Sequence, residues 1–199
     1  MHSEPPAPPF PTGDNPPPWR KFSSERGADL LLFKTRWDLL ENPRTSARMK
    51  RLVLETRDWV NVVAFTPQGE LVVVRQFRFG AARVTTEIPG GVVDPGEDPL
   101  QAAQRELREE TGFTGGEWSS LGAVEPNPAF HDNLCYHFLA RGVHSTHRQE
   151  LDGGEDIRAG LLSRDALRAS IASGEINHAL VISALSRVMD LSGLHPTET

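Results

Sequence analysis

The sequence predicts an α/β fold in which mixed β-sheets are sandwiched between helices. Several strand-like runs precede one strongly punctuated helix, more strand-like runs follow it, and two helical patterns stand near the end. With 199 residues, of which 38% are hydrophobic, the chain can bury one good core. We therefore expect one main domain with appendages.

The charge and the cysteine usage restrict the class of protein further. The net charge of −6 argues against a nucleic-acid partner or an anionic membrane surface. The only cysteine, Cys135, cannot form an internal disulfide framework or a cysteine zinc site, which fits a reducing cytoplasm. No apolar stretch approaches the roughly 18 residues that a membrane span needs. We expect a soluble, cytoplasmic protein.

The amino-terminal part divides into a tail and a strand-rich segment. Residues 1–18 contain eight prolines, which favours an extended tail. Residues 19–57 form a strand-rich segment, the main domain spans residues 58–192, and residues 193–199 form a second tail. The strand-like runs are DLLLFKTRWDLL, RMKRLVLE, WVNVVAFT and ELVVVRQFRF, and the turn signal Pro67-Gln68-Gly69 joins the last two as a hairpin.

Beyond the charged middle of the chain, strands alternate once more with helices. The runs WSSLGAVE, LCYHFLA and DIRAGLL read as strands. Ser163 is placed to cap a helix that runs through Ser173 and that Gly174 stops. Asn177 is placed to cap a second helix, HALVISALSRVMD, whose apolar residues recur at helical spacing.

The segment GEDPLQAAQRELREETGF contains its own helix signals. Asp98 stands at the N-cap position, Pro99 at the first helical position, and Gln101 completes a capping-box pattern. Gly112 stands where a left-handed stop is expected. These signals predict a helix from about Pro99 to Thr111.

Three glutamates, Glu106, Glu109 and Glu110, share one face of this helix. Each close pair of like charges costs roughly 0.2–0.5 kcal/mol, and Arg105 is placed at i, i+4 to hold Glu109. Most charge runs are ordinary solvated faces, but three clustered carboxylates also suit a hard cation such as Mg²⁺. We expect them to point outward and an adjacent apolar stripe to anchor the helix, namely Leu100, Ala103 and Leu107.

A longer pattern surrounds these glutamates. It reads Gly91, five residues, Glu97, seven residues, Arg105-Glu106-Leu107, one residue, Glu109-Glu110, one residue, Gly112-Phe113. This pattern resembles a complete Nudix box, the motif of the Nudix hydrolases, and it covers 23 of the 199 residues. The flanking segments resemble the branch that hydrolyses ADP-ribose and nucleoside diphosphate sugars; they are VVVRQFRFG, EIPGGVVDPGE, GGEDIRAGLLSRDAL and GEINHALVISAL.

The resemblance implies a fold, an activity and a cofactor. The fold is an α/β/α sandwich preceded by a strand-rich segment that helps to build a homodimer. The activity is Mg²⁺-dependent cleavage of a diphosphate, with Mn²⁺ as a possible substitute, giving a nucleoside monophosphate and a sugar phosphate. The metal ligands would be Glu106, Glu109 and Glu110, with the backbone carbonyl of Gly90. Glycine at positions 90 and 91 would let the backbone approach metal and phosphate closely.

Further roles follow from the same resemblance. Glu97 and Arg105 would brace the loop and the helix. Arg78 matches a substrate-contacting arginine, and Glu87, which opens the EIPGG segment, and Pro128 are also assigned to substrate binding. Arg75 is a weaker companion, because Arg75 and Arg78, three residues apart on one strand, face opposite ways.

A carboxylate must accept the proton of the attacking water. Related enzymes place this base on a late loop, so Glu155 in LDGGEDI is the candidate, with Asp152 and Glu110 behind it. Pro128 lies 15 residues beyond Phe113, a spacing that resembles the ADP-ribose enzymes. However, Asn127-Pro128-Ala129 stands where many of them have Ser-Pro-Gly, which leaves the identity of the sugar open.

Neighbouring residues and other functions remain as alternatives. His131 and Asp132, on the loop after Pro128, could touch the substrate, although a lone loop histidine is more often only solvated. The chain could instead hydrolyse nucleoside triphosphates, or it could be a catalytically inactive module that binds a nucleotide. Such modules usually lack box carboxylates, and none is missing here.

The strand-rich segment predicts assembly into a homodimer. Trp19, Phe33, Trp37 and several leucines provide more apolar surface than a pair of strands can bury alone. The alternative is a monomer in which this segment extends its own sheet.

Overall fold

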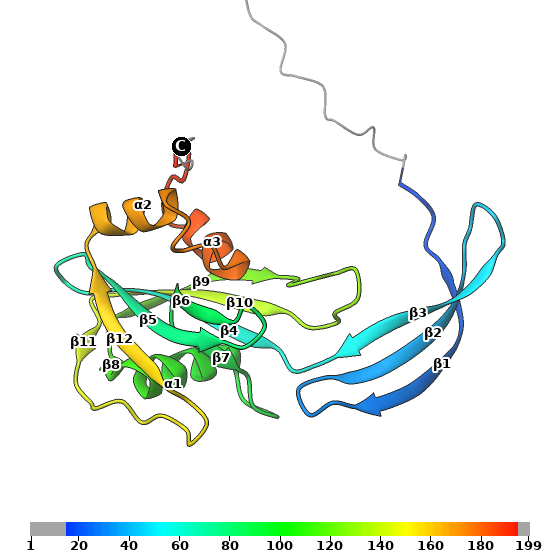
Figure 1. Cartoon of the computed structure of the whole chain (residues 1–199), viewed down its shortest axis with the longest axis horizontal. Coiled ribbons are helices and arrows are strands. Elements are labelled where there is room, and N and C mark those ends of the chain that lie inside the picture. The colour runs from blue at the N-terminus through cyan, green and yellow to red at the C-terminus, as the bar shows by residue number, and fades with distance from the viewer. Residues whose placement is uncertain (1–14, 195–199) are drawn as a thin grey trace, which may run out of the picture. The chain divides into compact units, whose positions relative to one another are not determined.

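The computed structural model describes residues 15–194 and divides into two compact units, Met1–Glu55 and Thr56–Thr199 (Figure 1). The predicted tails, residues 1–18 and 193–199, lie largely outside the described residues. Every helix within residues 15–194 is too short or too polar to cross a membrane.

The first unit contains a three-stranded antiparallel sheet in the order β1-β2-β3. Its strands are β1 (Arg20–Asp29), β2 (Lys34–Glu41) and β3 (Arg48–Glu55). The runs that predicted β2 and β3 are confirmed, but residues 30–32, predicted as strand, form the turn that follows β1. Strand β1 itself is polar and almost entirely exposed, so hydrophobic alternation does not reveal it.

The second unit is built on a seven-stranded mixed sheet with the path β12-β5-β4-β10-β9, on which β6 pairs with β5 and β7 pairs with β4. Only β4 and β10 run parallel, and the other pairs are antiparallel. A two-stranded sheet, β8 with β11, lies apart from this path. The bounds are β4 Trp59–Phe65, β5 Leu71–Arg78, β6 Arg83–Glu87, β7 Gly90–Val92, β8 Phe113–Thr114, β9 Glu117–Val124, β10 Cys135–Arg141, β11 His144–Ser145 and β12 Ile157–Leu162.

Helices cover both faces of the large sheet, which confirms the predicted sandwich. Helix α1 (Pro99–Thr111) lies on one face, and helices α2 (Arg164–Ala172) and α3 (Ala179–Ser186) lie on the other (Figure 1). Two apolar clusters fill the two layers. Val60, Val62 and Leu107 belong to the cluster under α1, whereas Val63 and Leu185 belong to the cluster under α2 and α3. Alternate residues of β4 thus feed both cores.

The carboxyl-terminal helices are confirmed with one correction. The Ser163 hydroxyl accepts the Ala166 N–H as predicted, and α2 ends before Gly174. Helix α3 is shorter than the predicted run, and His178 rather than Asn177 occupies its N-cap position. The Asn177 side chain instead accepts a hydrogen bond from Arg83.

Candidate active site

The ends of α1 are fixed by the local signals in the sequence. The Asp98 side chain accepts the backbone N–H of Leu100 at 2.9 Å, and Pro99 opens the helix. Gly112 ends it with φ of 75°, a left-handed conformation that glycine adopts without strain. The capping box predicted for Gln101 does not form among residues 15–194, because Asp98 caps the helix alone.

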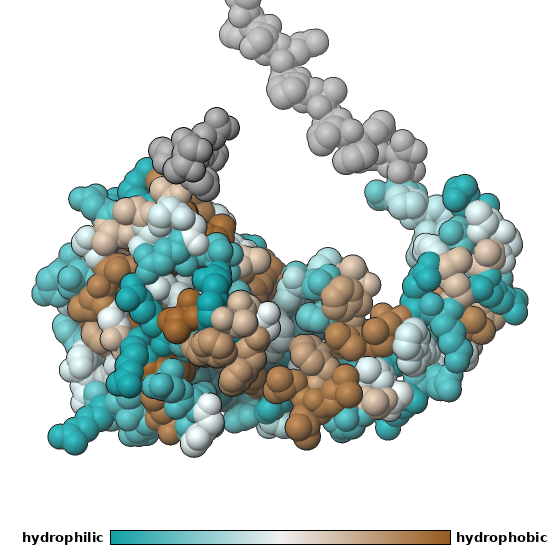
Figure 2. Space-filling model, in the orientation of Figure 1, coloured by the Kyte–Doolittle hydropathy of each residue, from teal (hydrophilic) through white to brown (hydrophobic). Residues whose placement is uncertain are grey.

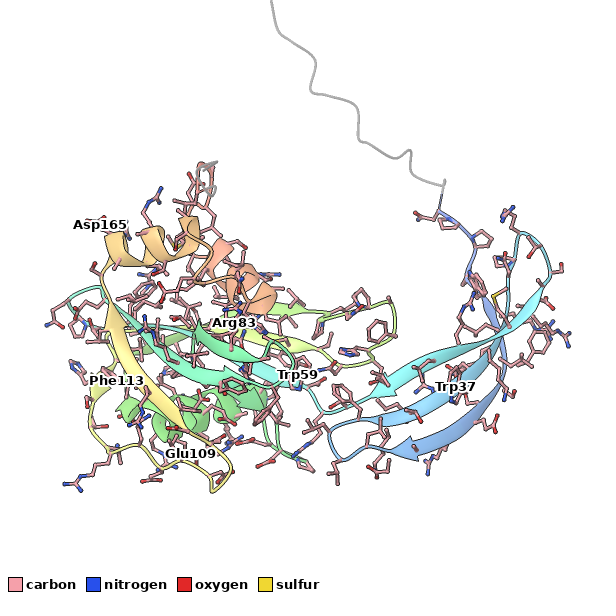
Figure 3. The ribbon with its side chains drawn as sticks, in the orientation of Figure 1. Trp37, Trp59, Arg83, Glu109, Phe113 and Asp165 are labelled. Atoms are coloured by element: carbon pink, nitrogen blue, oxygen red, sulfur yellow. The ribbon has the colours of Figure 1, made fainter. Side chains whose placement is uncertain are left out.

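Helix α1 is anchored by its apolar face. Ala102, Ala103 and Leu107 are completely buried against the sheet, and Leu100 packs beside them. This packing fixes the rotation of the helix, so the charged face is held toward the turn between β6 and β7 and toward the loop that precedes the helix. Glu109, in the last turn of α1, is labelled in Figure 3.

Arg105 ties the helix to the preceding loop. Its Nε and Nη2 donate to the two oxygens of Glu97, each at 3.0 Å, and Nη2 also donates to the carbonyl of Val92. Its Nη1 donates to Glu106 at 2.7 Å and to Glu109 at 3.2 Å, so the predicted i, i+4 ion pair is present. The hydrogen bonds to Glu97 are the largest of the effects that raise the pKa of Arg105.

Glu110 corrects the expectation that all three glutamates point outward. It is only 3% exposed, and its Oε2 accepts the backbone N–H of Gly90 at 2.9 Å. Burial raises the pKa of Glu110 to about 8, the Gly90 hydrogen bond opposes this rise, and the charges of Glu106 and Glu155 add to it. The carboxyl group therefore lies in the protein beneath the glycine turn rather than in solvent.

The glycine pair is required by close contacts. A Cβ atom on Gly90 would lie 2.2 Å from the carbonyl oxygen of Val60, and one on Gly91 would lie 2.4 Å from the Glu106 carboxyl group. Burial is also the main cause that raises the pKa of Glu106. The absence of a side chain at Gly91 thus leaves space for the Glu106 carboxyl group, and its absence at Gly90 lets the chain pass close to the backbone of β4.

The predicted substrate residues separate into two groups. Arg78, the last residue of β5, donates from Nε and Nη2 to both oxygens of Glu87 at 2.8 and 2.7 Å. Arg75 bonds to Glu175 at 2.7 Å and to Thr86 at 3.1 Å. Because Arg75 and Arg78 project from opposite faces of β5, the structure brings Arg78 and Glu87 together and keeps Arg75 apart from them.

The predicted base lies on a turn that faces the glutamates. The Asp152 N–H donates to Glu155 Oε2 at 3.1 Å, and the Glu155 N–H donates to the Asp152 carbonyl at 2.9 Å. The charge of Glu155 contributes to the raised pKa values of Glu106 and Glu110, after burial. The structure therefore brings the loop carboxylate into the electrostatic environment of α1.

Pro128 lies on the loop between β9 and β10, two residues before an aromatic group. The Phe130 and His131 rings meet edge to face at 4.9 Å, and the His131 and Trp59 rings do so at 6.2 Å. Asp132 on the same loop accepts the Thr56 N–H at 3.3 Å. His131 thus belongs to an aromatic cluster.

A family model described as the NUDIX domain matches residues 55–184. The matched part contains α1 with its three glutamates, the glycine turn and the Glu155 loop. The chain is a Nudix hydrolase. The resemblance seen in the sequence is therefore confirmed.

Relatives of this Nudix hydrolase include two bacterial enzymes. The ADP-ribose pyrophosphatase of Bacillus subtilis is 31% identical over 137 residues, which are 68% of this chain and 74% of that protein. The ADP-ribose pyrophosphatase of Mycobacterium tuberculosis is 30% identical over 169 residues, 84% of this chain and 81% of that protein. A crystal structure of an ADP compounds hydrolase matches the fold with a TM-score of 0.76 at 23% identity, covering 85% of this chain and 91% of the other.

Nudix hydrolases generally use a divalent metal, and the glutamates of this chain fit one chemically. Glu106, Glu109 and Glu110 offer only carboxylate oxygens, which hard cations prefer. Glu110 is buried without an ion pair among residues 15–194, as suits a group whose partner is a cation. No ready-made cluster of three ligating side chains exists in the described part of the chain, because Arg105 holds Glu106 and Glu109.

Two partners of the Arg78–Glu87 pair were not predicted from the sequence. Thr85 donates to Glu87 at 2.6 Å, and the Nδ1 atom of His178 lies 3.9 Å from Glu87. Although burial opposes the effect, the hydrogen bonds from Arg78 and Thr85 lower the pKa of Glu87. The alternation on β6 could have placed Thr85 beside Glu87, but His178 comes from a distant helix and has no local signal.

Proposed function

We propose that this Nudix hydrolase cleaves the diphosphate bond of ADP-ribose or of another nucleoside diphosphate sugar, using Mg²⁺, to give a nucleoside monophosphate and a sugar phosphate. The observation that carries the proposal is the set of three glutamates on α1 beside Gly90 and Gly91 at the start of β7. The substrate class is supported by the printed names of two relatives that each align with more than two thirds of the chain. Mn²⁺ is expected to substitute for Mg²⁺.

The chemistry explains why the carboxylates are concentrated here. A diphosphate repels an incoming hydroxide at neutral pH. When bound, a divalent ion neutralises phosphate oxygens and lowers the pKa of water. The ion would be held by the carboxylates of Glu106, Glu109 and Glu110 and by the backbone carbonyl of Gly90. The ion pair between Arg105 and Glu97 would fix the position of the helix relative to the preceding loop.

Glu155 is the proposed general base. Its turn is tied to Asp152 by two hydrogen bonds, so the carboxylate is presented from a defined loop. The assignment is supported by the effect of its charge on the pKa values of Glu106 and Glu110. It would accept the proton of the attacking water while the three α1 glutamates remain committed to the cation.

Arg78 is the proposed phosphate-binding residue. Glu87 fixes two of its nitrogens, whereas Nη1 has no hydrogen-bond partner among residues 15–194. Because Glu87 already fixes the orientation of the guanidinium, its remaining N–H donors can bind a phosphate oxygen with little further loss of side-chain entropy. Pro128 and its loop would contact the other end of the substrate, and Arg75 would support the outer face of β5.

The active enzyme is proposed to be a cytoplasmic homodimer formed through the first unit. Trp19 and Trp37 are about two-fifths exposed, and Leu31 is 96% exposed with Leu30 and Leu32 beside it. Figure 2 shows this leucine turn as an apolar group on the surface of the β1–β2 connection. Such a patch on a three-stranded sheet indicates an interaction surface, and two-fold dimers are the commonest assembly.

A substrate panel tests the proposed function. Purified protein with Mg²⁺ would be incubated separately with ADP-ribose, ADP-sugars, GDP-sugars, dinucleotides and nucleoside triphosphates, and the products would be identified by mass. We expect turnover of at least one nucleoside diphosphate sugar and its loss on addition of excess chelator. Turnover restricted to triphosphates would contradict the substrate class, and full activity with chelator would contradict the metal requirement.

A further inference from the structure

A cavity lies in the second unit, away from the glutamates. Its volume is about 310 Å³, and it opens where two neighbouring strands end. Phe65 ends β4 and Arg141 ends β10, and both residues line the cavity. These are the parallel strands of the sheet, and ligands of α/β proteins bind outside the carboxyl ends of such strands. The volume is at the lower end of the range for small-molecule sites.

The cavity is separate from the proposed active site. Leu71 at the start of β5 lines the cavity, whereas Arg78 ends the same strand. Seven residues at about 3.3 Å each separate the two ends by roughly 23 Å. The apolar residues of the cavity also belong to the core layer under α2 and α3, whereas α1 packs on the other layer.

The wall of the cavity is apolar. It is formed by side chains from β4, β5, β12, α2 and the segment after α3, which are Phe65, Leu71, Leu162, Leu167, Val188 and Met189. These elements are distant in sequence and packed in one layer, so the shape of the cavity is determined by the tertiary packing. A cavity with this lining suits a ligand whose apolar part is a compact aromatic ring or a branched aliphatic group.

Three polar side chains line the cavity, and each has a donor without an acceptor among the described residues. Arg141 and Arg164 line it, and neither makes an ion pair within residues 15–194. The Arg141 guanidinium lies 6.0 Å from the centre of the Phe65 ring. Thr66 is only 7% exposed; its hydroxyl oxygen accepts the Glu70 N–H at 3.2 Å, but its O–H has no acceptor among the described residues. Two exposed cations and one buried hydroxyl donor thus line a cavity whose remaining side chains are apolar.

We propose that this cavity is a second ligand site, specific for a small organic anion with a compact apolar body and a single carboxylate or phosphate group. The anionic group accepts hydrogen bonds from Arg141, Arg164 and Thr66, which satisfies the unused donors. The apolar body fills the space against the leucines and Met189. The site does not depend on which nucleotide the active site hydrolyses.

Methionine methyl groups provide a direct probe of this site. The chain contains three methionines, Met1, Met49 and Met189, and of the two within residues 15–194 Met189 lines the cavity and Met49 does not. Full-length protein labelled with ¹³C at the methionine methyl groups would be titrated with benzoate and with phenyl phosphate at millimolar concentration. Benzyl alcohol, which has the same ring without the charge, is the matched probe. We expect saturable shifts of the Met189 resonance with at least one of the two anions and affinity about tenfold lower for the alcohol.

The double variant Arg141→Ala/Arg164→Ala tests the anion contacts without opening the core, because both side chains lie at the surface. It should weaken binding of the anion by about tenfold or more. The control is Arg158→Ala on β12, an exposed arginine outside the cavity, which should bind as the wild type does. Three results would each overturn the proposal: no Met189 shift with either anion, equal binding of benzyl alcohol, or unchanged anion binding by the double variant.

Discussion

The backbone N–H of Gly90 donates a hydrogen bond of 2.9 Å to Oε2 of Glu110, a carboxyl group that is only 3% exposed. This contact joins the first residue of β7 to the last turn of α1. It fixes one glutamate under the turn while Arg105 holds the other two. The metal-free arrangement of the three carboxylates is therefore set by one backbone donor and one guanidinium, and Arg105 must release Glu106 and Glu109 for them to share a cation.

Replacing Glu110 by Gln should lower the metal-dependent activity without lowering the stability of the folded protein. The change keeps the size of the side chain and removes a carboxyl group whose ionised form is disfavoured by burial and by the charges of Glu106 and Glu155. We expect turnover to fall by about a hundredfold or more while the metal-free protein melts at the same or a higher temperature. Activity at saturating Mg²⁺ equal to that of the wild type would remove Glu110 from the metal site.

Removal of the metal should lower the melting temperature of the wild type. Ligand binding to the native state alone adds stability by mass action, so the shift should grow with the Mg²⁺ concentration. Differential scanning fluorimetry with Mg²⁺ and with chelator measures it. The Glu110→Gln variant should show a much smaller shift; equal shifts in both proteins would mean that the cation binds elsewhere.

Gly91→Ala should displace Glu106. The new Cβ atom would lie 2.4 Å from the Glu106 carboxyl group, which must then leave its present position. We expect about a tenfold or greater rise in the Mg²⁺ concentration needed for half-maximal activity. Gly80→Ala is the matched control, because a Cβ atom there meets nothing within 4 Å. If both variants respond alike to Mg²⁺, the close approach at Gly91 has no role in metal binding.

The two arginines of β5 should differ in their effect on catalysis. Loss of a charge-assisted contact to phosphate predicts that Arg78→Ala lowers kcat/KM by about 10- to 100-fold. Arg75→Ala should have a small effect, since Arg75 bonds to Glu175 and Thr86 on the opposite face. Steady-state kinetics on both variants measures the difference, and a larger loss in Arg75→Ala would reverse the assignment.

His137 should make the protein less stable in acid. It is completely buried, and neither of its ring nitrogens has a hydrogen-bond partner within the described residues. Burial, with a smaller contribution from Arg187, lowers the pKa of His137 from 6.5 to about 4. The unfolded state therefore binds the proton more tightly, and stability is lost as the pH falls from about 6.5 to about 4.

The variant His137→Leu should remove this pH dependence and should not destabilise the protein at neutral pH, because two unsatisfied polar atoms are lost. Urea unfolding at several pH values provides the measurement. The exposed His144→Gln is the control and should keep the wild-type slope. An unchanged slope in His137→Leu would show that another group causes the acid sensitivity.

Deleting the first unit should affect both assembly and substrate affinity. A chain that begins at Thr56 retains α1 and its glutamates, so the melting shift with Mg²⁺ should persist and report a folded domain. Light scattering should change from dimer to monomer, and KM should rise. A monomeric wild type at micromolar concentration, or an unaltered KM in the folded truncation, would end the dimer proposal.

The sequence predicted what depends on local signals and missed what depends on tertiary context. Asp98, Pro99 and Gly112 define α1 by short-range hydrogen bonds and backbone conformation, so its bounds agree with the structure. The burial of Glu110 depends on the turn at Gly90, twenty residues earlier in the chain, and no periodicity reveals it. The same holds for Arg75, whose partner Glu175 is one hundred residues away. Strand β1 was not predicted because its side chains are polar on both faces.

The proposed hydrolysis is tested most directly by a ³¹P NMR time course of ADP-ribose with the full-length protein, with Mg²⁺ in one sample and with excess chelator in the other. We expect the diphosphate signals to disappear only with Mg²⁺ and to be replaced by two phosphomonoester signals, from AMP and ribose 5-phosphate. If ADP-ribose fails, the same measurement on the ADP- and GDP-sugars should give the equivalent pair. Diphosphate signals that persist with every nucleoside diphosphate sugar in the presence of Mg²⁺, or that vanish equally with chelator, would contradict the central claim.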